Sequence, residues 1–259
     1  MSPRRTTTTA VLAGFLLSAC TTVGAREQEG GRELLVFAAA SLTEAFREIG
    51  AEFERQNKGV TVLLNFGPSD GLSTQILEGA PADVFASASD RWVDEIEANG
   101  PGVQSRTDFA RNSLAVIVPA DNPARISSIT DLGARGVKLV LAAPEVPVGE
   151  YSRRALGKAG VLEPAEANVV SNEQDVKGVV QKVMLGEADA GIVYVTDETP
   201  GVAPAVALID IPEHLNVAVT YPIAVVGDTD ESDLASRFVD FVLSEGQAVL
   251  RRFGFLPPI

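Results

Sequence analysis

Five junctions between strand-like and helix-like segments carry the groups in this 259-residue sequence that are best placed to do chemistry. Each junction offers a hydroxyl or a free peptide N–H where a helix is expected to begin or a strand to end. The residues concerned are Ser41, Ser69, Val148, Val176 and Tyr194. Helix N-termini attract anions because they present unpaired N–H groups and about half a positive charge. Together these groups suit an ionised oxyanion held by charge-assisted hydrogen bonds.

Two of the junctions are built from small residues and end in a serine. In the sequence Ala-Ala-Ala-Ser, the alanines let a ligand approach the backbone and Ser41 adds a hydroxyl. Residues 41–44, Ser-Leu-Thr-Glu, also match a capping box, which needs no ligand. A Gly- and Pro-containing turn in 66–76 places Ser69 at or just before a helix, where Ser69 or Asp70 can equally serve as the N-cap. Capping and ligand binding both remain open for each serine.

The other three junctions offer two backbone N–H groups and a phenol. A Pro-Val-Gly sequence fixes a tight loop before a helix and exposes the N–H of Val148. A helix expected to open near Asp175 leaves the N–H of Val176 free, as any helix start does. Tyr194 ends a strand, where it can donate to a ligand or lie in the core with its hydroxyl satisfied elsewhere.

Several function classes are disfavoured by what the sequence contains. It has one histidine, His214, one cysteine and a formal net charge of −14, which disfavours nucleic acid as a partner. The two serines lack a G-x-S-x-G setting, and there is no Walker A, G-x-G-x-x-G or H-E-x-x-H motif. Metal-binding Cys and His clusters are absent, although scattered carboxylates can bind a hard cation weakly. A reversible binding protein without a cofactor therefore fits better than an enzyme.

Apolar β-rich runs alternate with helical patterns, which predicts an α/β fold of mostly parallel sheets flanked by helices. The expected strands are 34–37, 60–66, 83–88, 113–119, 137–142, 190–195 and 220–227. The expected helices are one beginning at residue 41 and those at 71–78, 90–100, 150–160, 175–188, 233–244 and 247–255. Ligands of open α/β sheets bind at the carboxyl ends of strands, where four of the five junctions lie on this assignment.

The N-terminus has the features of an export signal. Residues 1–19 carry a basic pair and then an apolar segment that is too short to span a bilayer. The sequence Leu-Ser-Ala-Cys resembles a bacterial lipobox, so we expect cleavage before Cys20 and lipidation of Cys20, with a buried free thiol as the alternative. A single cysteine excludes an intramolecular disulfide. We interpret 20–32 as the lipidated cysteine and a flexible tether.

Seven motifs in order, across about residues 34–255, resemble the molybdate-binding proteins of bacterial ABC importers. The motifs are VFAAASLTEAF, EGAPADVFASA, RNSLAVIVP, PEVPVGEYSRRAL, GEADAGIVYVTD, YPIAVV and FGF. The resemblance implies a two-lobed periplasmic-binding-protein fold of type II, with two crossovers between the lobes. We assign 33–110 and 221–259 to lobe I and 111–220 to lobe II.

The resemblance also implies a role for each junction. Hydroxyls of Ser41, Ser69 and Tyr194 and backbone N–H groups of Val148 and Val176 would hold molybdate or tungstate in an interlobe cleft. Molybdenum would be bound only as the oxyanion. The receptor would be a monomer, periplasmic or lipid-anchored to the outer face of the cell membrane, and would deliver its ligand to an ABC permease with its ATPase.

Three departures from the family pattern concern the ligand. Val148 replaces an expected alanine, which a backbone contact tolerates. Asp70 replaces a small neutral residue, and Glu150 a basic or apolar one; a carboxylate beside a bound dianion would weaken binding or, on the metal, raise its coordination above four. Alternatives are a receptor for sulfate or another oxyanion, a lipid-anchored oxyanion sensor, and an enzyme acting on a small anion.

Overall fold

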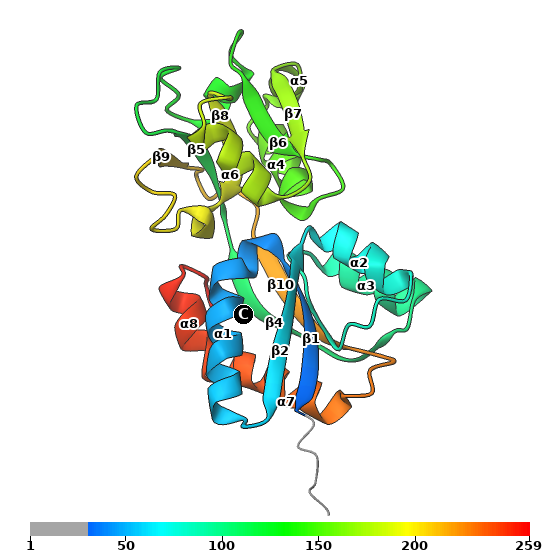
Figure 1. Cartoon of the computed structure of the whole chain (residues 1–259). Helices are drawn as coiled ribbons and strands as arrows, with labels where there is room; N and C mark the ends of the chain where they lie inside the picture. The colour runs from blue at the N-terminus through cyan, green and yellow to red at the C-terminus, as the bar shows by residue number, and fades with distance from the viewer. Residues whose placement is uncertain (1–30) are drawn as a thin grey trace, which may run out of the picture. The chain divides into compact units, whose positions relative to one another are not determined.

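Two five-stranded sheets flanked by helices make up residues 31–259, the part of the chain that this computed structural model describes (Figure 1). The first sheet has the order β2-β1-β3-β10-β4 and the second β7-β6-β8-β5-β9. The strands of the first sheet are β1 (Arg32–Ala39), β2 (Val60–Gly67), β3 (Val84–Ala86), β4 (Val103–Asn112) and β10 (Val219–Val226). The strands of the second are β5 (Leu114–Pro119), β6 (Leu139–Ala142), β7 (Val169–Glu173), β8 (Ala190–Tyr194) and β9 (Val206–Asp210). The predicted α/β class is confirmed.

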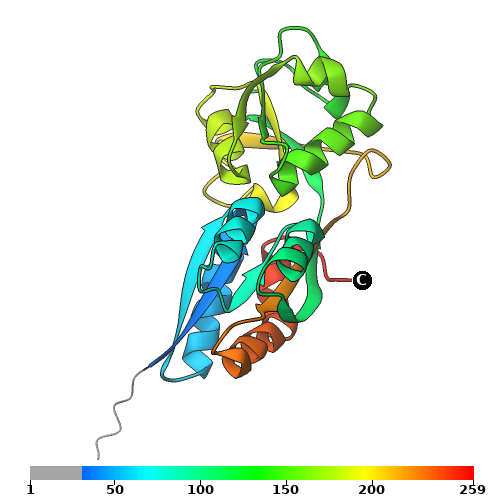
Figure 2. The same ribbon diagram turned by 90° about the vertical axis from the view of Figure 1, so that its right-hand side faces the viewer.

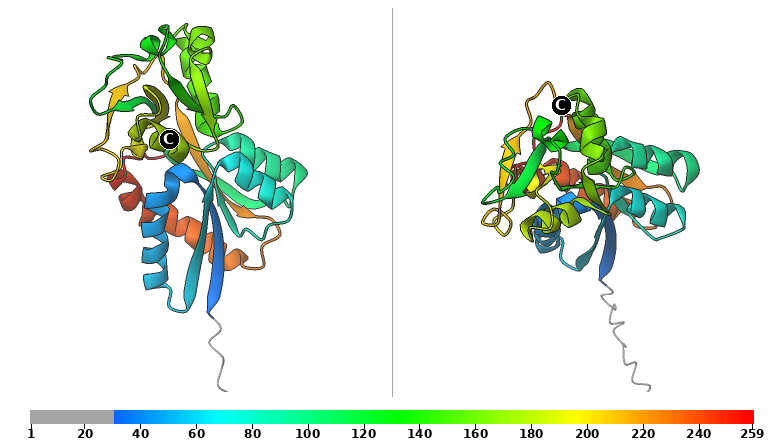
Figure 3. Two further views of the ribbon diagram at one scale, coloured as in Figure 1. Left: turned by 45° about the horizontal axis from the view of Figure 1, so that its top comes forward. Right: turned by 90° about the horizontal axis from the view of Figure 1, so that it is seen from above.

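Helices cover both faces of the first sheet because β1 alternates two sets of apolar side chains. Val36 belongs to a core that includes Phe46 and Phe238, from helices on one face, whereas its neighbour Phe37 packs with Leu72 and Ile96 on the other. The helices of the first face are α1 (Thr43–Gln56), α7 (Ser232–Leu243) and α8 (Gly246–Arg252), which lie together in Figure 3. Those of the second are α2 (Ser69–Leu77) and α3 (Asp90–Asn99).

The second sheet is flanked by helices that follow its parallel strands. These are α4 (Pro147–Lys158), α5 (Leu162–Glu166) and α6 (Val176–Met184). Helix α6 packs on β5, β6 and β8, while α4 packs on β6 and β8 and contacts α5. Three short 3₁₀ helices complete the elements: η1 (Ala40–Leu42), η2 (Ile129–Gly133) and η3 (Val195–Asp197).

The chain crosses between the sheets twice, and the two crossings lie side by side (Figure 2). The first runs from β4 to β5 through Ser113, and the second from β9 to β10 through residues 211–218. Asn112, at the end of β4, is paired with Val219, at the start of β10. The two predicted crossovers are thus present, and the exact lobe limits remain a prediction.

Strand pairing is evenly mixed, whereas the sequence predicted mostly parallel sheets. β1 is parallel to β2 and β3, and β6 is parallel to β7 and β8. β10 and β5 are antiparallel to both of their neighbours. Each of these two strands is the first after a crossing, and each runs against both of the strands beside it. Hydrophobic periodicity does not encode that direction.

Three strands escaped prediction, and all three are edge strands: β4, β7 and β9. An edge strand buries less of its surface, so its apolar pattern is broken by exposed polar residues. The export signal, lipidation of Cys20 and most of the tether lie outside the described residues. Within 31–259, no helix combines the length and apolar character that a membrane span requires.

Candidate anion-binding site

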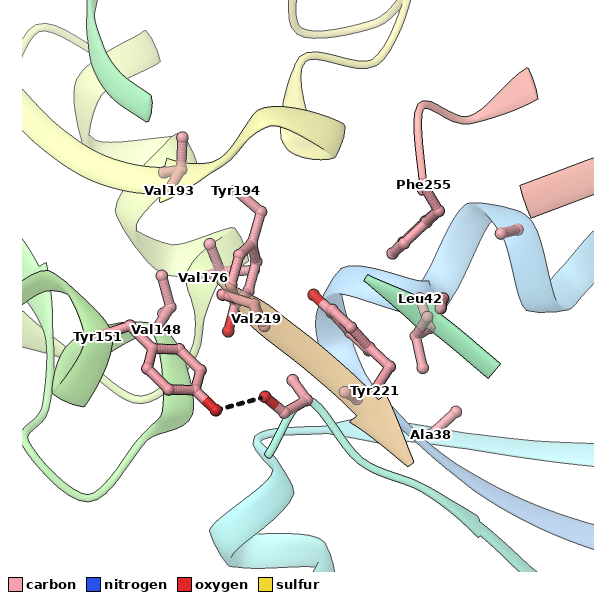
Figure 4. Packing of buried hydrophobic residues seen from close by; sticks show 14 of the residues in the cluster. Ala38, Leu42, Val148, Tyr151, Val176, Val193, Tyr194, Val219, Tyr221 and Phe255 are labelled. Carbon is pink, nitrogen blue, oxygen red and sulfur yellow. Dashed lines mark hydrogen bonds between the residues drawn. The ribbon is translucent and has the colours of Figure 1, made fainter. Parts of the chain in front are cut away.

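A small cavity lies where the carboxyl ends of strands from both sheets meet helix N-termini. The space in it that is open to the centre of a water-sized sphere is about 20 Å³, against the ~10–15 Å³ that one water molecule requires, so only a small ligand fits. The lining residues are Ala39, Ala40, Ser41, Gly67, Pro68, Ser69, Ala88, Val146, Pro147, Val148, Asp175, Val176 and Tyr194. All five residues singled out in the sequence are therefore brought to one cavity. Figure 4 shows three of them, Val148, Val176 and Tyr194, together with Tyr221, whose ring centroid lies 6.0 Å from that of Tyr194.

Ser41 lies in the 3₁₀ turn η1 rather than at the start of α1. Helix α1 begins two residues later, at Thr43, and no side chain caps either helix start. The capping-box interpretation of residues 41–44 is therefore wrong, because the 3₁₀ turn shifts the helix register. The Ser41 hydroxyl is buried and lies 3.0 Å from the hydroxyl of Tyr221, which comes from β10.

Ser69 is the first residue of α2, and Pro68 occupies the N-cap position. Neither Ser69 nor Asp70 caps the helix, as the alternative interpretation required. Instead, Oγ of Ser69 accepts a hydrogen bond of 3.1 Å from the backbone N–H of Ala88, which follows β3. No acceptor for the hydroxyl proton of Ser69 is recorded among the described residues, so this proton can be donated into the cavity, which Ser69 lines.

Val148 lies in the first turn of α4, which begins at Pro147, three residues earlier than predicted. First-turn N–H groups have no intrahelical acceptor, so the N–H of Val148 is available to a ligand. Gly149 makes this early start possible: a Cβ there would lie 2.0 Å from the carbonyl oxygen of Ala143. The close approach of helix and strand end therefore requires glycine.

Val176 is the first residue of α6, and its N–H is likewise without an intrahelical acceptor. Asp175 is the N-cap, and its Oδ1 accepts a hydrogen bond of 2.9 Å from the N–H of Gly178. This bond ties the Asp175 carboxylate to the helix end, although Asp175 itself lines the cavity. Asp175 is a lining residue beyond the five predicted from the sequence, and an Asp directly before a helical stripe is the signal that identifies it.

Tyr194 ends β8 with its side chain 1% exposed. Its hydroxyl has no hydrogen-bond partner among the described residues, although it is buried. Burial raises the pKa of Tyr194 well above its usual value, so the phenol remains neutral and keeps its proton. A buried hydroxyl without a partner carries a desolvation penalty, which a ligand in the cavity would remove.

The electrostatics of the cavity favour a negative ligand without any basic side chain in its lining. Helices α2, α4 and α6 all direct their N-termini at it, and no Lys, Arg or His is among its lining residues. Helix N-termini supply fixed partial positive charge and N–H donors. The donors are neutral, as expected from the sequence, and the one carboxylate in the lining, that of Asp175, accepts a hydrogen bond from the N–H of Gly178.

The two carboxylates that depart from the family pattern do not line the cavity. Glu150 lies 3.8 Å from Arg91 and 3.9 Å from Arg154 in ion pairs. Asp70 is not among the residues that line the cavity, and burial raises the pKa of its carboxyl group. Neither residue is placed to coordinate a ligand in this cavity.

Two further features of the described residues concern histidine chemistry and metal binding. His214 lies exposed in the segment between β9 and β10, away from the cavity. Residues 31–259 contain no group of three or more His, Cys, Asp or Glu side chains arranged to hold a metal ion.

Residues 34–256 match the family model described as bacterial extracellular solute-binding protein. The chain belongs to this family. The solute-binding protein is 40% identical over 231 residues to the molybdate-binding protein ModA of Mycobacterium tuberculosis, covering 89% of this chain and 87% of the relative. It is 31% identical over 252 residues to the putative ABC transporter substrate-binding lipoprotein YvgL of Bacillus subtilis, covering 95% of each.

Among solved structures, the solute-binding protein resembles the periplasmic molybdate-binding protein of Azotobacter vinelandii. The TM-score is 0.76 at 20% identity, covering 87% of this chain and 100% of the other. At that identity the likeness shows the fold alone, and the predicted two-lobed architecture is confirmed by it. The predicted family is confirmed by the family model and the sequence relatives above. The family is extracellular, and these relatives are named as binding proteins rather than enzymes. Ligand contacts at the five residues remain predictions.

Proposed function

We propose that this solute-binding protein is a receptor for molybdate, and for tungstate, that binds the oxyanion in the cavity described above. The observation that carries the proposal is the buried hydroxyl of Tyr194, which lines the cavity and has no partner among the described residues. An anion in the cavity satisfies it. Molybdate is the preferred candidate because the relative at 40% identity is named as a molybdate-binding protein.

The donor set fits a tetrahedral dianion on physical grounds. Hydroxyls of Ser41, Ser69 and Tyr194 and N–H groups of Val148 and Val176 approach from both sheets. Hydrogen bonds to a charged group contribute about 1.5–3 kcal/mol each, net of the hydrogen bonds to water that they replace. Donors without a fixed counter-charge also allow release, because no salt bridge has to be broken.

Transport is the use we propose for the bound anion, by delivery to an ABC permease and its ATPase. A relative at 31% identity is named as a substrate-binding lipoprotein of an ABC transporter, which supports both the transporter partner and the lipid anchor.

The lipobox ending at Cys20 supports the anchor independently. We propose a monomer held at the outer face of the membrane. Cys20→Ser should move the protein from the membrane fraction to the soluble fraction of cells, and an unchanged distribution would contradict the anchor.

A thermal-shift comparison of the purified protein with molybdate, tungstate, sulfate and phosphate tests the ligand. Ligand at 100 times its Kd stabilises by about 2.7 kcal/mol, which raises Tm by roughly 2–4 °C per kcal/mol at this size. We expect shifts with molybdate and tungstate alone. A shift with sulfate as well would make this a general receptor for tetrahedral dianions, and no shift with any oxyanion would reject the proposal.

A further inference from the structure

We propose that Tyr221 is a positioning residue for the anion site, and that Asn112 orients it so that the Ser41 proton points into the cavity. Tyr221 is not among the cavity-lining residues, so it would act through Ser41. The inference rests on the proposed function, because the Ser41 proton matters only if an anion accepts it.

The amide of Asn112 has one possible orientation. Its Oδ1 accepts a hydrogen bond of 2.9 Å from the backbone N–H of Ser113, which can only donate. Nδ2 therefore faces the other way, donating to Oγ1 of Thr196 at 2.8 Å and, over a longer 3.4 Å, toward the hydroxyl of Tyr221. Asn112 is buried, so these groups do not exchange with water.

This orientation decides the direction of the bond between Tyr221 and Ser41. The two hydroxyl oxygens lie 3.0 Å apart, and either can be the donor on geometry alone. Since an amide proton of Asn112 faces the oxygen of Tyr221, the phenol proton is directed away from it. Ser41 is the one acceptor within hydrogen-bond distance of Tyr221 in the described part of the chain, so Tyr221 donates to Ser41. Burial raises the pKa of Tyr221, which keeps that proton in place.

The proton of Ser41 is then left for the cavity. If Ser41 donated to Tyr221 instead, the proton of a fully buried phenol would have no acceptor, which is costly. A chain of donors that runs Asn112, Tyr221, Ser41 and anion is also cooperative, because each bond polarises the next. Ser69 reaches the same state independently, since it accepts the N–H of Ala88.

This chain of hydrogen bonds from Asn112 through Tyr221 to Ser41, called the relay below, begins where the chain crosses between the sheets. Asn112 ends β4 and is paired with Val219 of β10, while its partner Thr196 belongs to η3 after β8. The direction of the Ser41 proton therefore depends on contacts that both sheets contribute, next to the crossing segments.

A double-mutant cycle, read by calorimetric titration with molybdate, tests the relay. Tyr221→Phe removes the phenol proton and keeps the ring, and we expect the affinity to fall about three- to tenfold, the range of one neutral hydrogen bond. In a Ser41→Ala background the same change should alter the affinity less than twofold, whereas in a Ser69→Ala background its full effect should persist. Tyr151→Phe is the matched control, since its hydroxyl donates to the carbonyl of Ala88 and not to Ser41. Its effect should be the same with and without Ser41.

Equal losses for Tyr221→Phe with and without the Ser41 hydroxyl would overturn the proposal, as would unchanged affinity in the single variant. Thermal unfolding without ligand distinguishes a failure of this proposal from a failure of the proposed function. It is measured on the unaltered protein, Tyr221→Phe, Ser41→Ala and the variant that carries both changes. Coupling between Tyr221 and Ser41 in Tm without ligand, together with no binding of any oxyanion by the unaltered protein, would keep the hydrogen bond but reject both proposals about the anion. Binding by the unaltered protein without coupling in the affinities would reject the relay alone.

Discussion

Lys177 of α6 and Glu44 of α1 form an ion pair, with 2.9 Å between Nζ and Oε2, that joins helices flanking the two different sheets. Nζ of Lys177 also lies 3.5 Å from Oδ1 of Asp197, a fully buried carboxylate. Burial opposes the charge of Lys177, but the two carboxylates outweigh it and raise its pKa. Lys177 directly follows Val176 in the chain. The cavity has no basic lining residue, but the residue next in sequence to one of its lining residues is a cation.

Removing Lys177 should harm anion binding more than removing its exposed partner. Lys177→Met removes the positive charge that directly follows the Val176 donor and leaves the Glu44 carboxylate unpaired, so we expect the molybdate affinity to fall at least tenfold. Glu44→Gln removes a half-exposed pair worth about 1 kcal/mol or less and leaves Lys177 facing Asp197, so we expect less than a threefold change. Titration calorimetry at low and high salt measures both. Equal losses in the two variants would mean that the ion pair, rather than the charge of Lys177, supports the site.

The two serines should account for a large part of the binding free energy. Ser41→Ala with Ser69→Ala should weaken molybdate binding by roughly 3–6 kcal/mol, at about 1.5–3 kcal/mol for each bond to a charged acceptor. Ser73→Ala is the matched control: Ser73 is a buried serine of α2 that donates to the carbonyl of Trp92 and does not line the cavity. Equilibrium dialysis measures all three proteins. Unchanged affinity in the double variant would place the site elsewhere.

The site could be predicted from sequence because its donors are local features of strand-to-helix transitions. A few neighbouring residues are enough to indicate the small residues before Ser41, the turn before Ser69 and the helix start at Val176. The structure brings all three to one cavity. What could not be predicted is long-range. The partner of Ser41 is Tyr221, 180 residues away, and the partner of Ser69 is Ala88, 19 residues away in the loop after β3.

The fold shows the same division between local and long-range information. The buried strand β1 and the amphipathic helix α1 carry strong periodic patterns and were predicted, whereas the edge strand β4 carries a mixed pattern and was missed. Pairing direction depends on where the chain crosses between sheets. Helix starts differ from prediction by two residues at α2 and three at α4, because the ends of a helix are the part of it that the sequence defines least sharply.

A proline at position 176 should remove one donor while preserving the helix. Val176 is the first residue of α6, where proline is favoured, and the preceding Asp175 has φ −153° and ψ 177°, which suits a residue before proline. Val176→Pro should therefore lower the molybdate affinity about tenfold or more, the range of one bond to a charged acceptor, with little change in Tm without ligand. Val176→Ala is the control, because it shortens the side chain but keeps the N–H. If both variants bind equally, the N–H of Val176 does not contact the anion.

Asp197 should make stability depend on pH. Burial raises its pKa from 3.8 to about 6, against the opposing effect of Lys177, so the folded protein binds the proton more tightly than the unfolded chain. The stability that this group contributes is present below pH 4 and is lost as the pH rises to about 6, by at most about 3 kcal/mol for a shift of this size.

Asp197→Asn removes this titration while keeping a carbonyl oxygen as acceptor for the N–H of Tyr194, which now donates to Oδ2 at 3.0 Å. Lys177 retains Glu44 as its partner. We therefore expect the free energy of unfolding of the variant, minus that of the unaltered protein, to increase between pH 4 and pH 6 and to be level above pH 7. Urea unfolding at half-unit pH steps measures this difference. The contributions of the other titrating carboxyl groups are the same in both proteins and cancel in it. Parallel profiles would mean that Asp197 stays ionised in the folded protein throughout, held by Lys177.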